Sequence, residues 1–190
     1  MPIRKILKIA IFFNNFRGLL LSKYLSSNGF YVENIITKKN LNKGILEKLN
    51  KFIIINNLKS KQLINKLEKK EFDIFISAGF PHIFKSNFLK IPKLGILNLH
   101  AGKLPKYRGG SPLNWQLINA EKRIGISVIL INEKIDQGDI VAKASFPNSN
   151  KLDIFQAHKI ANKLFVKLTL RSIKKLEKKS KLKSQNNCNS

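Results

Sequence analysis

The sequence contains little that could crosslink the chain, bind a soft metal or cross a membrane. Its single cysteine, Cys188, excludes a disulfide within the chain and a cysteine-based metal site. No apolar run approaches the roughly 18 to 20 residues that a membrane-spanning helix needs. The first sixteen residues also lack the small-residue cleavage site of a secretory signal. We therefore expect a cytoplasmic protein with no metal site and no membrane span.

Acidic residues are also scarce: 11 Asp and Glu stand against 36 Lys and Arg, for a net charge of +25. Such a charge attracts anionic substrates and favours loose, nonspecific association with RNA. Most of the basic residues are spread along the chain, as an AT-rich coding sequence would produce. A denser cluster lies between Lys167 and Lys183 on a helical pattern. We interpret it as a solvated helix face, with an RNA-binding element as the alternative.

Strand-like and helix-like patterns alternate along the chain, and its length suits one domain. This alternation predicts an α/β, doubly wound fold whose mainly parallel sheet is flanked by helices. We expect the domain to cover 1–178 and a disordered basic and polar tail to cover 179–190, because nothing after Ser180 looks packable. The expected strands are 8–13, 30–36, 52–55, 72–77, 95–99 and 126–131; the expected helices are 18–27, 42–51, one capped by Ser60, 113–120 capped by Ser111, and one capped by Asp153.

Three polar side chains fall where this fold would bring them together. Asn98 and His100 end an apolar strand and, being two apart, point to the same face of the sheet. Asp136 follows the next long apolar run, in the turn IDQGD, so its carboxylate can arrive beside the imidazole from a neighbouring strand end. An amide, an imidazole and a carboxylate together form a set suited to acyl transfer.

Each of the three has a physical task when a formyl group moves onto an amine. The Asn98 amide can stabilise the oxyanion of the tetrahedral intermediate. His100 can take the proton that the amine loses, since histidine is the residue type that titrates near neutral pH. Asp136 can orient the imidazole and support its charged form. A lone Asn-x-His pair at a strand end is more often structural, so the case depends on the surrounding motifs.

Those motifs resemble one family. The order NLH at 98–100, LPKYRG at 104–109, a Pro-led helix and then IDQGD at 135–139 is similar to the folate-dependent formyltransferases. The resemblance is strong over 72–141, weaker over 6–36 and absent after about residue 150. It implies a Rossmann-like domain, 10-formyltetrahydrofolate as the donor, and catalytic roles for Asn98, His100 and Asp136. Many members have Ser where this chain has Gly102, which affects the substrate side of the site.

The resemblance also implies binding residues. A folate pocket is expected to use Ser77, Ala78, Gly79, Phe80 and Pro81 after one strand, and Gln137, Gly138 and Asp139 in the IDQGD turn. The first of these segments is equally readable as an ordinary strand-to-helix turn. Substrate contacts are expected from Lys103, Tyr107, Arg108 and Gly109, where the Arg108 guanidinium suits a phosphate or carboxylate. A purely structural role for Arg108, bonding loop carbonyls, stays open.

The acceptor is expected to be a small, phosphate-bearing amine, chosen by elimination as an amino sugar on a nucleotide. The first strand-to-helix turn, FFNNFRG, lacks the phosphate cradle that glycinamide ribonucleotide would need. Methionyl-tRNA is the other enzymatic alternative, although we expect no second domain that could hold the acceptor stem. A non-catalytic, RNA-associated protein of the same fold is the remaining alternative. A second copy of the chain is considered as a partner.

Overall fold

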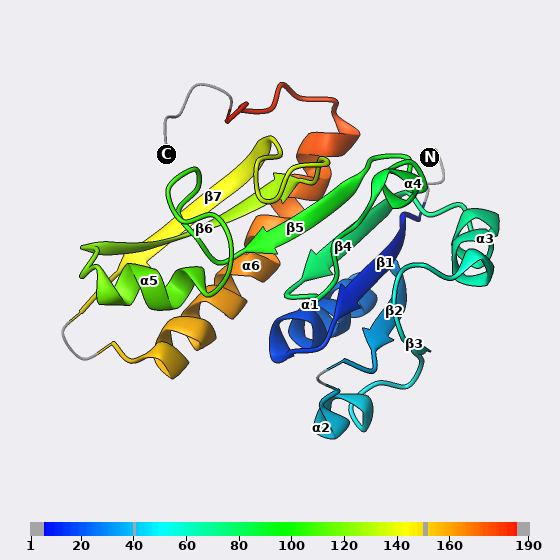
Figure 1. The fold of residues 1–190 in the computed structure, drawn as a ribbon, viewed down its shortest axis with the longest axis horizontal. Coiled ribbons are helices and arrows are strands. Elements are labelled where there is room, and N and C mark those ends of the chain that lie inside the picture. Colours follow the sequence, from blue (N-terminus) through cyan, green and yellow to red (C-terminus); the bar gives the residue numbers. More distant parts are fainter. Residues whose placement is uncertain (1–5, 40, 150–151, 186–190) are drawn as a thin grey trace. The chain divides into compact units, whose positions relative to one another are not determined.

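The computed structural model describes residues 6–39, 41–149 and 152–185, and the chain divides between Leu97 and Asn98 into two compact units. Figure 1 shows the course of the chain. Hydrogen-bonded strands follow the order β3-β2-β1-β4-β5-β6-β7 in a sheet of seven strands, of which β5 (Ile96–His100) contains the division between units. The pairing of β1 with β2 and β4, and of β2 with β3, is parallel. The predicted α/β, doubly wound fold is confirmed.

The first unit is a parallel sheet of short buried strands with helices between them. Its elements are β1 (Lys8–Phe13), α1 (Phe16–Ser27), β2 (Tyr31–Thr37), α2 (Lys43–Leu46), β3 (Ile53–Ile55), α3 (Lys61–Lys69), β4 (Ile74–Ala78) and α4 (Ser86–Leu89). The expected strands are present with ends shifted by one or two residues. Ser60 caps α3 as predicted, because its hydroxyl accepts from the Leu63 N–H at 3.3 Å. The helix expected at 42–51 is reduced to the four residues of α2.

The core of this unit is aromatic. Phe12 is fully buried, and its ring lies 5.1 to 5.4 Å from the rings of Phe75, Phe80 and Phe84. Edge-to-face contacts at these separations add to the hydrophobic gain of burial. They fix the carboxyl ends of β1 and β4, where the chain turns toward the following helices.

The second unit contains an antiparallel pair covered by one long helix. Its elements after β5 are α5 (Pro112–Ile118), β6 (Arg123–Leu130), β7 (Ile140–Pro147) and α6 (Ile154–Glu177), and α6 packs on β6 and β7. Asp153 caps α6 as predicted, in a capping box with Gln156. Helix α5 begins as predicted, with Ser111 before it and Pro112 as its first residue, but the expected side-chain cap is absent. Ser111 adopts a left-handed conformation, φ 51°, from which its side chain bonds no helix N–H.

The chain turns back along β7 after α6 ends. The backbone of Lys183 exchanges two hydrogen bonds with that of Ile140, at 2.8 and 3.2 Å, as an antiparallel bridge. Gln185 is only 3% exposed. The expectation that nothing after Ser180 packs is therefore wrong at these positions, and the expected tail residues 186–190 lie outside the described residues.

In the described part of the chain, no helix has both the length and the apolar character needed to cross a membrane. No group of three or more His, Cys, Asp and Glu side chains in it is arranged to hold a metal ion.

Candidate functional site

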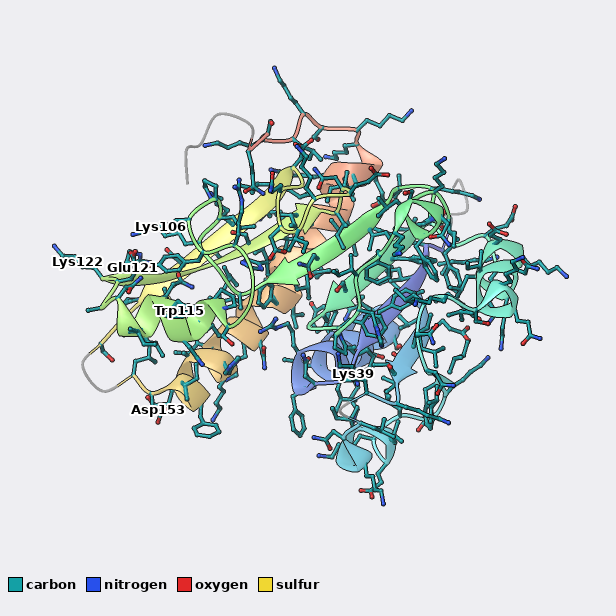
Figure 2. The ribbon with its side chains drawn as sticks, in the orientation of Figure 1. Lys39, Lys106, Trp115, Glu121, Lys122 and Asp153 are labelled. Atoms are coloured by element: carbon teal, nitrogen blue, oxygen red, sulfur yellow. The ribbon has the colours of Figure 1, made fainter. Side chains whose placement is uncertain are left out.

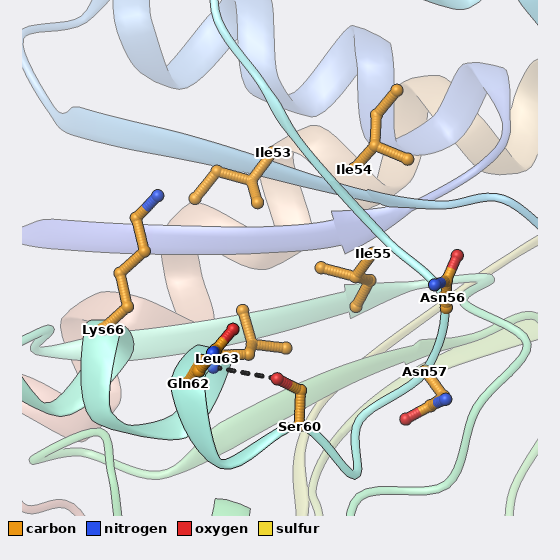
Figure 3. Close-up of a pocket in the computed structure, with 9 residues that line it drawn as sticks. All are labelled: Ile53, Ile54, Ile55, Asn56, Asn57, Ser60, Gln62, Leu63 and Lys66. Carbon is orange, nitrogen blue, oxygen red and sulfur yellow. Dashed lines mark hydrogen bonds between the residues drawn. The ribbon is translucent and has the colours of Figure 1, made fainter.

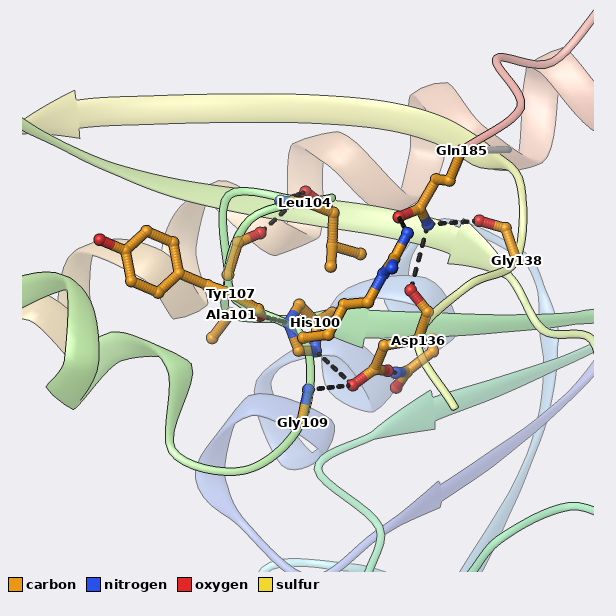
Figure 4. A network of polar contacts seen from close by, with 12 residues as sticks. His100, Ala101, Leu104, Tyr107, Gly109, Asp136, Gly138 and Gln185 are labelled. Atoms are coloured by element: carbon orange, nitrogen blue, oxygen red, sulfur yellow. Dashed lines mark hydrogen bonds and ion pairs between the residues drawn. The ribbon is translucent and has the colours of Figure 1, made fainter. Parts of the chain in front are cut away.

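The side chains of Asn98, His100 and Asp136 converge in the second unit. Asn98 and His100 lie on β5, and the intervening Leu99 is buried at 1% exposure, as alternation along a strand requires. Asn98 Nδ2 donates to Asp136 Oδ1 at 3.2 Å, and His100 Nδ1 lies 3.4 Å from Asp136 Oδ2. Figure 4 shows the imidazole and carboxylate facing one another. The predicted convergence is confirmed by these distances, whereas the catalytic roles stay predictions.

The turn that carries Asp136 holds the carboxylate in a narrow set of positions. Asp136 adopts a left-handed conformation, φ 52°, which is uncommon for a residue with a side chain. The backbone N–H of Gly109 donates to Asp136 Oδ2 at 2.9 Å. At Gly138 a Cβ atom would lie 1.8 Å from the Leu130 carbonyl oxygen, so this turn must pack against the end of β6 without a side chain.

The second nitrogen of His100 has a partner of its own. Nε2 lies 2.5 Å from the carbonyl oxygen of Tyr107. A carbonyl oxygen can only accept, so Nε2 carries a hydrogen in this arrangement. The lone pair of the neutral ring then belongs to Nδ1, the nitrogen beside Asp136 and Asn98. After protonation, Asp136 and Tyr107 would each accept one ring N–H. The sequence could not indicate which nitrogen faces which partner.

Gly102, where the resemblance led us to expect a serine, lies against this imidazole. A Cβ atom at 102 would lie 2.5 Å from His100 Nε2 and 2.6 Å from the Tyr107 carbonyl oxygen. Both distances are shorter than non-bonded atoms tolerate. A serine at this position is therefore incompatible with the contact between His100 and Tyr107 seen here.

The expected substrate residues Lys103 and Tyr107 both contact Glu121, a residue that the sequence analysis missed; their substrate roles stay predictions. Tyr107 Oη donates to Glu121 Oε1 at 2.7 Å, and Lys103 Nζ lies 3.5 Å from Oε2. Lys106 Nζ donates to Oε1 at 2.8 Å. Figure 2 labels Lys106 and Glu121. The hydrogen bonds from Lys106 and then Tyr107, with the charges of the lysines, lower the pKa of Glu121 to about 2. The one sequence signal that could have indicated Glu121 was that it is an acidic residue in a chain with few acidic residues.

Arg108 and Gly138 are joined by a residue from the end of the described chain. Arg108 Nη2 donates to Gln185 Oε1 at 3.2 Å, and Gln185 Nε2 donates to the Gly138 carbonyl oxygen at 2.6 Å (Figure 4). Arg108 Nε is buried and makes no hydrogen bond within the described chain. In the expected donor segment, by contrast, the side chains of Gln137 and Asp139 are exposed and available to a ligand.

The segment Ser77–Pro81 lies in the first unit, where packing already accounts for much of it. Gly79 has φ +67°, and a Cβ atom there would lie 2.1 Å from Asn15 Nδ2. The glycine is thus required by the approach of Asn15, whatever ligand is present. Phe80 is 9% exposed and belongs to the aromatic core. A folate role for these residues stays a prediction.

Two cavities also lie in the first unit. One of about 330 Å³ is lined by Ile53–Asn57, Ser60, Gln62, Leu63 and Lys66 (Figure 3), and its single ionisable lining residue offers no acid–base pair. The other, of about 500 Å³, includes Pro81 and His82. His82 Nε2 lies 2.9 Å from Thr37 Oγ1, and burial and then the charge of Lys39 lower the pKa of His82.

A methyl group at position 102 should disturb the packing around His100. We expect Gly102→Ala to destabilise the protein by about 1–3 kcal/mol, because the imidazole or the Tyr107 carbonyl must move. Gly110→Ala is the matched control, since a Cβ atom there meets nothing within 4 Å. The control should stay within about 0.5 kcal/mol of the wild type. Urea denaturation measures both, and equal midpoints for the two variants would contradict the packing described.

The Glu121 cluster should contribute to stability in a defined pH range. A carboxyl whose pKa is lowered stabilises the folded state above its unfolded pKa and loses that contribution as the pH falls through its folded pKa. The contribution of Glu121 should therefore be complete above about pH 4.5 and disappear toward pH 2. Glu121→Gln should cost about 1 kcal/mol at pH 7, because solvent screens the exposed lysines. The difference from wild type should shrink in acid, and the exposed Glu133→Gln serves as control. A stability difference between Glu121→Gln and wild type that stays constant with pH would contradict the lowered pKa of Glu121.

Known proteins were compared with the chain. The model of the formyl transferase family matches residues 25–163. The bifunctional polymyxin resistance protein ArnA of Wigglesworthia glossinidia brevipalpis is 46% identical over 97 residues, 51% of this chain and 14% of that protein. Methionyl-tRNA formyltransferase of Clostridium beijerinckii is 36% identical over 118 residues, 62% of this chain and 38% of that protein. The chain therefore matches well under half the length of either relative.

One solved structure has the same fold. It is an N-formyltransferase from Helicobacter canadensis in complex with folinic acid and dTDP-3-aminofucose, with a TM-score of 0.75, 20% identity, and coverage of 96% of this chain and 68% of that one. The family model covers most of this chain and includes Asn98, His100 and Asp136. The chain belongs to the formyl transferase family.

Proposed function

We propose that this chain transfers a formyl group from 10-formyltetrahydrofolate to a primary amine at Asn98, His100 and Asp136. The observation that carries the proposal is the Asp136 carboxylate, which accepts from the Asn98 amide and faces His100 Nδ1. Structural histidines at strand ends need no such pair of neighbours. Family membership supports the same reaction class.

The contacts of His100 define which atom takes the proton. With Nε2–H directed at the Tyr107 carbonyl, the neutral ring presents the Nδ1 lone pair. As the amine nitrogen bonds to the formyl carbon, its proton passes to Nδ1, and Asp136 stabilises the resulting imidazolium. The bond from the formyl carbon to the donor nitrogen then breaks, and that nitrogen takes the proton from the His100 imidazolium, which returns the ring to its neutral form.

Asn98 can stabilise the intermediate while it orients the carboxylate. One of its two amide hydrogens goes to Asp136 Oδ1. The second is the hydrogen proposed to bond the oxyanion that forms when the amine attacks. A neutral donor suits this position, because it cannot protonate the oxyanion before the donor nitrogen leaves.

Binding of the donor is assigned to two segments. In the second unit, Gln137, Gly138 and Asp139 follow Asp136 directly, and exposed amide and carboxylate side chains suit the ring N–H groups and carbonyl of a pterin. In the first unit, Ser77–Pro81 follows the carboxyl end of β4, the position at which α/β folds bind ligands. The bound donor supplies the formyl group.

The proposed acceptor is an amino sugar on a nucleotide. The loop that carries Arg108 and Gly109 lies next to Asp136 and provides a guanidinium that can bind phosphate. The Helicobacter canadensis protein of the same fold is described with a nucleotide-linked amino sugar. Lys103, Tyr107, Arg108 and Gly109 are the residues proposed to contact it.

Methionyl-tRNA is the second candidate, because relatives more than 30% identical carry that name. One face of α6 supports it, since Lys167, Arg171, Lys174 and Lys178 are exposed and line a groove of about 360 Å³. Their spacing of three and four residues puts the four cations on one side of the helix. Such a row can follow a phosphate backbone.

The carboxylate and amide should be separable by mutation. We expect Asp136→Asn to keep the fold and lower kcat by at least about 10³-fold, because it removes the charge that supports the imidazolium. Asn98→Ala should lower kcat by about 10²–10³-fold, the loss typical of one oxyanion donor. Asp153→Asn, which keeps a good helix cap away from the site, is the control. Tetrahydrofolate release measures the rate. Full activity of Asp136→Asn would remove the carboxylate from the mechanism.

An acceptor panel should identify the amine. We expect formylation of a nucleotide-linked amino sugar and no formylation of glycinamide ribonucleotide. A variant with Lys167→Glu, Arg171→Glu and Lys174→Glu should retain this activity, because small-molecule binding does not need the α6 face. Formylation of methionyl-tRNA by the wild type, abolished in this variant and by raised salt, would instead establish the second candidate.

A further inference from the structure

Gln185 is buried between the two loops of the candidate site, although it comes from a segment with no recognisable motif. Two residues before it, the backbone of Lys183 forms an antiparallel bridge with Ile140, which holds this segment of the chain in place. Its side chain, 3% exposed, reaches the turn that contains Asp136 and the loop that contains Arg108 (Figure 4). None of the roles assigned above uses it.

The hydrogen bonds of this side chain determine the orientation of its amide. Nε2 donates to the carbonyl oxygens of Asp136, at 3.2 Å, and Gly138, at 2.6 Å. Oε1 accepts from Arg108 Nη2 at 3.2 Å. Reversing the amide would direct its oxygen at two carbonyl oxygens and its NH₂ at a guanidinium. Only one orientation satisfies all three partners, so the side chain is a specific connector and not a space filler.

These contacts act on the residue that organises the trio. Gln185 bonds the main-chain carbonyl of Asp136, whose side chain bonds Asn98 and the Gly109 N–H and faces His100. The left-handed backbone of Asp136 is uncommon and persists only where surrounding contacts determine it. Gln185 supplies such a contact on one side of the turn, and the Leu130 carbonyl limits it on the other.

We propose that Gln185 is a positioning residue, which holds the Asp136 turn and the Arg108 loop so that the Asp136 carboxylate meets His100 and Asn98. This inference rests on the proposed formyl transfer. It assigns the segment after α6 to the catalytic unit. A displacement of about 1 Å at a reacting group can cost about 100-fold in rate, so a connector outside the chemistry can have a large effect.

The test compares Gln185→Leu, which removes the amide at similar size, with Gln185→Asn, which keeps an amide that is one methylene shorter. Lys183→Gln is the control, because that side chain is exposed and only its backbone makes the bridge. We expect Gln185→Leu to lower kcat by about 10–100-fold, a loss larger than any rise in KM, although Arg108 and Gly138 in the proposed binding segments also lose a partner. Gln185→Asn should fall between Leu and wild type, and should decide the question if the Leu variant does not fold.

A second measurement needs no activity. Hydrogen exchange at the Gly109 amide reports its bond to Asp136 Oδ2, and we expect it to quicken about ten-fold in Gln185→Leu and stay unchanged in Lys183→Gln. Unchanged kcat with unchanged exchange would overturn the positioning role. A lower KM for the donor or a raised kcat would also overturn it, because the tail would then be a competitor for the site. If Gln185→Leu quickens the exchange of the Gly109 amide while the wild-type chain formylates no amine, only the proposed function is refuted and the contact of Gln185 with the Asp136 turn stands.

Discussion

The Asp136 carboxylate is the constraint on which the candidate site depends. An ionised carboxylate only accepts hydrogen bonds, and here it accepts from the Asn98 amide and the Gly109 N–H while facing His100 Nδ1. These groups come from β5, the loop after it and the connection between β6 and β7. One side chain therefore connects three segments of the second unit. Its loss would leave two donors and an imidazole without the acceptor around which they are arranged.

Close backbone approach keeps that carboxylate and the imidazole in place. At Gly138 and Gly102 a Cβ atom would meet a main-chain carbonyl oxygen, and at Gly102 it would also meet the His100 ring. The site is thus formed by backbone oxygens as much as by side chains. His100 accordingly has a neighbour at each ring nitrogen, the Tyr107 carbonyl oxygen at Nε2 and Asp136 Oδ2 at Nδ1.

Patterns with a short sequence range predicted most of the fold and the three central residues. Alternation along β5 placed Asn98 and His100 on one face, and the glycine turn after β6 placed Asp136 beside them. The Ser60 and Asp153 caps were also local signals. The start of α5 after Ser111 was a local signal too, but its side-chain cap was not formed, since Ser111 adopts a left-handed conformation that the residue type does not indicate. A helix at 42–51 was wrong in extent, since only one of the four residues of α2 is buried.

Other features depended on contacts between distant residues. Glu121 contacts Tyr107, Lys103 and Lys106. These contacts depend on the conformation of the loop around 101–111, which the spacing of residues in the sequence does not predict. Gln185 bonds residues 47 to 77 positions away in a polar, motif-free segment. Side chains that connect loops leave no periodic pattern, because their position follows from where the chain returns after its last helix. The roles of such residues can be recognised only when the structure is known.

The large positive charge acts on a different scale from this site. A field from 25 excess cations raises the local concentration of any anionic ligand, and at physiological salt it is screened beyond about 8 Å. A folate, a nucleotide and an RNA would all be attracted, so the charge does not select among acceptors. Selection must come from contacts within a few ångströms of the amine. The loop of Tyr107, Arg108 and Gly109 is the segment next to Asp136 that can supply them, and its geometry is set by specific hydrogen bonds to His100, Gln185 and Asp136 rather than by net charge.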